Sequence, residues 1–331
     1  MLYYNKLLYY NIFMINRIQT YILVLFIALV ALVSSAHAEV KVVTSIKPIH
    51  SLVSYIMDGV GKPDVIVDGY NSPHNFSLKP SHAKMLENAD LVIWVGENLE
   101  TFLEKPLNAI AKKAKNIEIM DLKGIKKLEF REKNIFEEHD EHGHDEHKEH
   151  DEHKEKDSHE GHAHGKHDPH VWLDPINAKL IIKEITKQLV QLDAKNSSAY
   201  KSNSKKALAE MDNLIQTIQK DLNKDLRFVV FHDAYQYFEN RFGIQVLGSL
   251  TVNTDVMPGA EQLSEIREVI EHEKVNCLFS EPQFNPAIIK SIAKDTNVKI
   301  GTLDPLGAKL DKGKNLYFNL LKDMSSSFKG C

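Results

Sequence analysis

From residue 39 onward, short runs rich in Val and Ile alternate with segments whose apolar residues recur at helical spacing. The first half of the chain has such runs at 39–46, 63–68, 90–96 and 116–122, and the second half at 227–233, 244–250, 276–282 and 298–304. Helical spacing occurs at 48–59, 81–88, 176–192 and 259–273, and again from Pro286. Repeated strand–helix units predict an α/β fold whose sheets are mostly parallel.

The length of the chain, 331 residues, exceeds what one hydrophobic core usually supports, so we expect two lobes. Residues 196–223 form a long, polar helical pattern that would span about 42 Å. We therefore expect an N-terminal Rossmann-like lobe at 39–192, a connecting helical segment at 193–226 and a C-terminal Rossmann-like lobe at 227–331. The two lobes would face each other across a cleft.

The N-terminal region has the pattern of an export signal. An apolar run at 18–35 follows Arg17 and precedes Ala36-His37-Ala38, which has the small-x-small form of a signal-peptidase site. This predicts a signal peptide at 1–38, cleaved after Ala38, with Met14 as a possible true start. A retained membrane anchor is the alternative, because the run approaches the roughly 20 residues that span a bilayer. No cysteine follows the run to attach a lipid.

A histidine-rich segment at 137–168 interrupts the strand–helix pattern. Ten of the 17 histidines lie in it, mixed with Glu, Asp, Lys and Gly. The segment has no apolar periodicity, so we expect a disordered loop that offers several weak, exchangeable metal sites. A solvated loop without function is the alternative. The histidines are His139, His142, His144, His147, His150, His153, His159, His162, His164 and His167.

Other polar residues follow the ends of predicted strands, where parallel sheets bind ligands. His74 follows the strand at 63–68, His232 ends the strand at 227–233, and His170 lies between Pro169 and Pro175. Three imidazoles with one open position suit zinc, whereas calcium and magnesium prefer oxygen ligands. Each histidine taken alone could equally be a hydrogen-bonded structural residue. Asp304, at the end of the last predicted strand, is a candidate for the fourth ligand or for a partner of a ligand.

The net charge of -5 argues against nucleic acid as a main partner. The only cysteines are Cys277 and Cys331. In an oxidising compartment, an even pair indicates a disulfide, although two separate buried thiols remain an alternative.

Ordered motifs over the whole mature chain carry a resemblance to a known family. They are SPHNFSLKPS, ADLVIWVGENLE, DPHVWLDP, FVVFHDAYQYFENRFG, CLFSEPQFNPA and GTLDPLG. With them the chain resembles the ZnuA family, the zinc-binding components of bacterial zinc ABC transporters. The resemblance implies a monomeric periplasmic protein, not an enzyme, that passes zinc to a membrane permease. It also implies zinc ligands at His74, His170 and His232 and a disulfide between Cys277 and Cys331.

Two features bear on the choice of metal and ligands. Relatives that import manganese carry a carboxylate at the position of His232, so this residue favours zinc over manganese or iron. Some family members have a glutamate just before the first histidine, whereas this chain has Pro73, so water or Asp304 must complete the shell. A zinc hydrolase is the other alternative, and the chain lacks the HExxH motif of one such class.

Overall fold

The structure, a computed structural model, describes residues 14, 17, 19, 39–131, 133–136, 166–252, 254 and 258–331. Residues Met1–Glu39 and Val40–Cys331 form separate compact units. In the first unit Met14, Arg17 and Gln19 are helical and exposed, so signal cleavage after Ala38 and a start at Met14 stay predictions. None of the helices in the described part is long and apolar enough to span a membrane.

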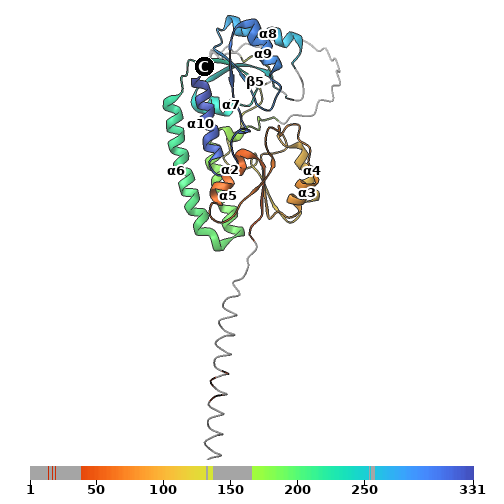
Figure 1. Ribbon diagram of the computed structural model, residues 1–331, viewed down its shortest axis with the longest axis vertical. Helices are drawn as coiled ribbons and strands as arrows, with labels where there is room; N and C mark the ends of the chain where they lie inside the picture. Colours follow the sequence, from red (N-terminus) through yellow and green to blue (C-terminus); the bar gives the residue numbers. More distant parts are fainter. Residues whose placement is uncertain are drawn as a thin grey trace, which may run out of the picture. The chain divides into compact units, whose positions relative to one another are not determined.

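The unit Val40–Cys331 is an α/β structure with two four-stranded sheets, as predicted (Figure 1). The first sheet has the order β2-β1-β3-β4 and the second β6-β5-β7-β8, and all pairings are parallel. The second half therefore repeats the strand order of the first. The strands of the first sheet are β1 Val42–Ile46, β2 Asp64–Val67, β3 Leu91–Trp94 and β4 Lys115–Glu118. Those of the second are β5 Arg227–His232, β6 Gln245–Thr251, β7 Cys277–Ser280 and β8 Lys299–Thr302.

Helices surround both sheets. The helices of the first half are α2 Lys47–Ile56, α3 Pro80–Glu87, α4 Thr101–Ala109, the 3-10 turn η1 Val171–Leu173 and α5 Pro175–Leu192. They are followed by the turn η2 Ala194–Asn196, α6 Ser197–Asp221, α7 Gln236–Phe242, α8 Ala260–His272, α9 Ala287–Thr296 and α10 Leu316–Lys329.

The long helix α6 joins the two halves of the chain. It buries Tyr200, Ala207, Met211, Leu214 and Ile218, whose spacing forms one apolar stripe, and packs against α5, α2 and α10 (Figure 1). Its 25 residues span about 38 Å. One continuous hydrophobic cluster includes residues of both sheets and of all four helices, so the halves share a core.

The sequence analysis gave no range for α4, α7 or α10. Helix α4 contains Pro106, which removes a hydrogen-bond donor and conceals the helical pattern. Helix α7 has only seven residues and buries Gln236, Tyr237, Phe238, Glu239 and Phe242, so it lacks the polar stripe that marks an amphipathic helix.

The C-terminal helix α10 links both halves. Its Phe328 packs against Phe228 and Phe238, with ring centroids 4.8 and 5.6 Å away, while Phe318 packs against Tyr55 of α2 at 5.5 Å. Just beyond the helix, Cys331 forms a disulfide with Cys277 at the start of β7. The predicted disulfide is confirmed.

The residues just before the histidine-rich segment and the last three residues of the segment are part of the described structure. Ile135 bridges Gly248 of β6, and Phe136 N–H donates to Leu247 O at 3.0 Å. At the other end His167 bridges Glu129, and Asp168 N–H donates to Leu128 O at 2.9 Å. Residues 166–168, which the sequence analysis assigned to the disordered loop, are therefore anchored by backbone hydrogen bonds.

Candidate metal centre

Three histidines from different parts of the chain meet at the carboxyl ends of the strands. His232 is the last residue of β5, and His170 directly precedes the turn η1. His74 lies between β2 and α3, in a segment without regular secondary structure. For His74 and His232 the strand–helix pattern places the side chain at the edge where the rule for parallel sheets predicts ligands.

The three imidazoles form a compact group. One ring nitrogen from each of His74, His170 and His232 lies within 4.8 Å of the others. His170 and His232 are buried, and His74 is half-buried. The Nε2 atoms of His170 and His232 are 3.2 Å apart. The cavity that these residues line has a volume of about 10 Å³, which is about the space of one water-sized occupant.

Asp168 fixes the orientation of His170. Its Oδ1 accepts hydrogen bonds from the His170 backbone N–H at 2.9 Å and from Nδ1 at 2.7 Å. Burial lowers the pKa of His170 well below its usual range, and His232 lowers it further. The ring is therefore neutral with its proton on Nδ1, and the Nε2 lone pair faces the other histidines. Burial raises the pKa of Asp168, and the hydrogen bond from the His170 backbone N–H offsets only part of this rise. The resulting pKa is about 7.

Glu281 holds His232 in the same way. Its Oε1 and Oε2 lie 2.9 and 3.1 Å from Nδ1 of His232. Burial alone would lower the pKa of His232, but the charge and hydrogen bond of Glu281, together with the charges of Asp233 and Asp168, outweigh burial and raise it. Without a metal, a proton on Nε2 of His232 can be donated to the lone pair on Nε2 of His170. The site thus has one position for a cation between two imidazoles, and each imidazole is hydrogen-bonded to a carboxylate.

Trp172 and Asp304 shape the walls of the site. The Trp172 ring lies 5.2 Å from the His170 ring, and its Nε1–H donates to Pro305 O at 2.8 Å. Asp304 accepts from the backbone N–H groups of Leu306 at 3.1 Å and Ala308 at 2.6 Å. Its Oδ1 also accepts from Gln283 Nε2 at 2.9 Å. The structure does not bring Asp304 into the group of metal-ligating atoms. Instead, Asp304 holds the turn whose carbonyl anchors Trp172.

The sequence analysis did not assign a role to Asp168, although it contained a signal. Asp168 lies two residues before His170, and this spacing allows one carboxylate to accept from both the backbone and the ring. The residue was included in the histidine-rich loop because its neighbours have the same composition. For Glu281, in the predicted strand at 276–282, the sequence left three roles open: a metal ligand, an acceptor that holds an imidazole, or a helix cap. The structure shows the second arrangement, because Glu281 contacts Nδ1 of His232.

The accessory histidines lie mostly outside the described residues. This applies to His139, His142, His144, His147, His150, His153, His159, His162 and His164. His167 is described, half-buried, and held by its backbone bridge to Glu129. Its carbonyl accepts from Asn98 Nδ2 at 3.4 Å.

Comparisons with known proteins agree with this architecture. The family model for ZnuA, "Zinc-uptake complex component A periplasmic", matches residues 42–331. The high-affinity zinc uptake system protein ZnuA of Brucella abortus is 46% identical over 303 residues, covering 88% of this chain and 91% of the relative. The protein of the same name from Haemophilus ducreyi is 44% identical, covering 93% of this chain and 97% of the relative.

A solved structure has the same fold. The crystal structure of a ZnuA superimposes with a TM-score of 0.71 at 25% sequence identity. The match covers 88% of this chain and 98% of that chain, so the two-sheet arrangement is shared over almost the full length of the solved protein.

Proposed function

The chain belongs to the ZnuA family of periplasmic zinc-uptake components, and on this basis we propose that it captures one zinc ion through His74, His170 and His232. In this proposal the chain is exported, loses residues 1–38, and acts as a monomer in the periplasm. It then delivers zinc to the membrane permease of an ABC transporter. The names of its relatives support zinc uptake, and the geometry of the three imidazoles supports the ligand set.

One observation carries the proposal. The Nε2 atoms of His170 and His232 are 3.2 Å apart. Two nitrogens bound to one tetrahedral zinc at 2.0–2.1 Å lie roughly 3.3 Å apart, so these two rings already have the spacing that zinc requires. Asp168 and Glu281 accept from the opposite ring nitrogens, which leaves the Nε2 lone pairs for the metal.

The donor set favours zinc over manganese. Three imidazole nitrogens suit zinc, whereas manganese prefers carboxylate and water oxygens. Both oxygens of Asp304 accept hydrogen bonds from the backbone of their own loop, which supports water as the fourth ligand. A cavity of about 10 Å³ is about the size of one water-sized occupant, which suits a single ion.

The metal content of the protein tests this function. Protein purified from the native periplasm without added metal should contain about one equivalent of zinc by mass spectrometry of inorganic elements. Apo protein offered zinc and manganese at equal concentration should also retain zinc. Retention of manganese or iron in both experiments would replace the zinc assignment. N-terminal sequencing of the same sample should start at Glu39.

The carboxylates Asp168 and Glu281 should tune the affinity. We expect Glu281→Gln to weaken zinc binding by roughly 10–100-fold, because the amide no longer stabilises positive charge on the His232 ring. Glu281 raises the pKa of His232, so its loss should also lower the pH at which protons compete with zinc. The difference in affinity between wild type and variant should therefore be largest at pH 8 and smaller at pH 6. Competition titrations with a zinc chelator at both pH values measure it.

A purely structural role for Glu281 would give a different result. The loss of zinc affinity would then be the same at both pH values, and the melting temperature of the variant would also be lower. Glu268→Gln serves as the matched control, because Glu268 is an exposed residue of α8 and the change removes the same charge.

We propose that the histidine-rich segment collects or buffers zinc near the site. Its histidines recur every two or three residues over most of its length, which suits several weak sites. Replacing residues 138–165 by a ten-residue Gly-Ser linker should leave one tight zinc site and remove the additional weak binding, as isothermal titration calorimetry can show.

The design of this deletion follows from the anchored ends. Asp168 must stay because it orients His170. A ten-residue linker is long enough to connect the two ends of the replaced stretch. Phe130 N–H donates to Lys166 O, so these two residues are neighbours, and Phe136 lies only six residues after Phe130. Loss of the tight site in this variant would contradict the division into one transport site and several accessory sites.

A further inference from the structure

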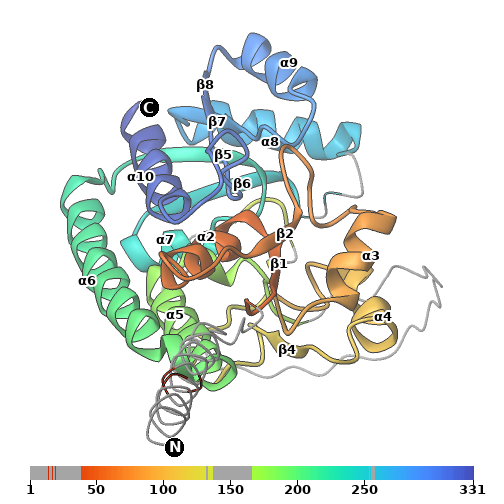
Figure 2. The same ribbon diagram turned by 60° about the horizontal axis from the view of Figure 1, so that its bottom comes forward.

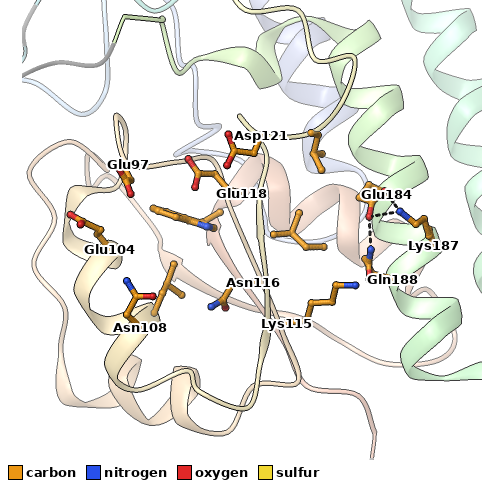
Figure 3. Close-up of a pocket in the computed structure, with 14 residues that line it drawn as sticks. Glu97, Glu104, Asn108, Lys115, Asn116, Glu118, Asp121, Glu184, Lys187 and Gln188 are labelled. Atoms are coloured by element: carbon orange, nitrogen blue, oxygen red, sulfur yellow. Dashed lines mark hydrogen bonds and ion pairs between the residues drawn. The ribbon is translucent and has the colours of Figure 1, made fainter.

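A groove on the first sheet lies outside the candidate metal centre. It has a volume of about 620 Å³, within the roughly 300–1,000 Å³ of pockets that bind ligands. Strand β4 forms its length, and helices α4 and α5 contribute residues on either side. Trp94, Leu107 and Ile117 contribute apolar surface. We call it the β4 groove; Figure 3 shows its lining side chains, and Figure 2 shows where β4 lies in the fold.

The backbone of β4 has a free edge in this groove. Within the described residues, β4 pairs only with β3. The N–H groups of Lys115 and Ile119 donate to Asp90 O and Trp94 O, at the β3 side. Because successive amides of a strand point to opposite sides, the N–H and C=O groups of Asn116 and Glu118 face away from β3. The Glu118 C=O already accepts from the Asp121 N–H at 3.2 Å, so both groups of Asn116 and the Glu118 N–H remain for a further strand. A strand edge of this kind can pair with a further extended segment.

The side chains of the groove are rich in hydrogen-bond acceptors. Figure 3 shows Glu97, Glu104, Glu118 and Asp121 on one side, and none of these four forms an ion pair with another described residue. On the opposite side Glu184 is paired with Lys187. Burial raises the pKa of Glu118, and the like charges of Asp121 and Glu97 raise it further. This end of the groove therefore favours a cation.

Gln188 provides an independent indication of a ligand. It lines the groove and its side chain is only 3% exposed. Its Nε2 donates to Glu184, while its Oε1 has no hydrogen-bond partner among the described residues. A buried amide oxygen without a donor costs roughly 1–3 kcal/mol, so the position favours an incoming N–H group.

We propose that the β4 groove binds an extended polypeptide segment of a partner protein that carries arginine or lysine side chains. The segment would pair with the free edge of β4, place its apolar side chains on Trp94, and direct its basic side chains to the four carboxylates. A metal ion fits less well, because the described carboxylates here do not converge within ligand distance of one another. The chain's own residues 137–165 carry twelve carboxylates and three lysines, so their charge opposes binding in this groove.

Calorimetry with the full mature protein tests the proposal. The probe is an acetylated, amidated eight-residue peptide in which valine and arginine alternate. We expect one-to-one binding. The isosteric double variant Glu118→Gln/Asp121→Asn should weaken it at least tenfold, because it removes two of the four carboxylates. The matched control Glu268→Gln/Glu271→Gln removes the same charge from the exposed side of α8 and should change the affinity less than twofold.

A second probe separates strand pairing from charge. The same peptide with alternate backbone amides N-methylated should bind at least tenfold more weakly, and only the unmethylated peptide should slow hydrogen exchange at the Asn116 and Glu118 amides. Absence of binding, equal losses in the two double variants, or equal binding of both peptides would each overturn the proposal. Zinc affinity is measured separately and should not change in either double variant. A negative result with the peptides would therefore not contradict the proposed zinc site.

Discussion

Replacing His232 with alanine should weaken zinc binding by more than the roughly 10–100-fold that loss of an outer-shell partner costs. The variant loses one of the three proposed nitrogen ligands and also leaves Glu281 in a buried site without the ring that it holds. His170→Ala should have a similar effect, because it removes a ligand and the partner of Asp168. Competition with a chelator of known affinity measures both constants.

The control for this prediction is His272→Ala. His272 is exposed at the end of α8 and lies outside the three-histidine group, so its replacement should leave zinc affinity unchanged. Unchanged affinity in His170→Ala or His232→Ala would overturn the ligand assignment. Equal melting temperatures of the apo variants would show that any loss comes from the site and not from unfolding.

The position of His232 explains why so much of the site could be predicted. Parallel strands end at one edge of a sheet, so a histidine that ends a Val- and Phe-rich run already has a defined location. The same reasoning applies to His74, which follows β2, but not to His170, which follows no strand of the described structure. It also located Asp304, but a strand end does not determine where a carboxylate points. Backbone N–H groups of the following turn occupy the Asp304 oxygens, and this contact depends on the local turn geometry.

The arrangement around α10 shows what the sequence could not provide. The pattern of strands and helices predicted two lobes, but α10 follows the second sheet and packs on α2, which follows the first strand. This contact joins residues more than 250 positions apart, such as Tyr317 N–H and Ser51 Oγ at 2.9 Å. Local periodicity contains no information about such a pair. Asp168 was missed for another reason, because composition alone cannot separate an anchored residue from its neighbours.

Removal of the disulfide should lower the stability of the protein strongly. The Cys277–Cys331 bond closes a loop with a sequence separation of 54, for which the chain-entropy model gives a stabilisation of about 4 kcal/mol. We expect the double variant Cys277→Ser/Cys331→Ser to lose about this much free energy of unfolding in urea titrations. The same loss should follow reduction of the wild-type protein.

The variant should nevertheless stay folded and bind zinc at 25 °C. Phe328 still packs among Phe228, Phe238 and Phe279, which keeps α10 on the second sheet without the covalent bond. Neither cysteine belongs to the three-histidine group, so zinc affinity should match that of the wild type. A loss below about 1 kcal/mol would contradict the chain-entropy account. A fall in zinc affinity at a temperature where the variant is fully folded would instead show that the position of α10 controls the site. That coupling is physically plausible through Tyr317, whose hydroxyl donates to the carbonyl of Trp172 beside His170.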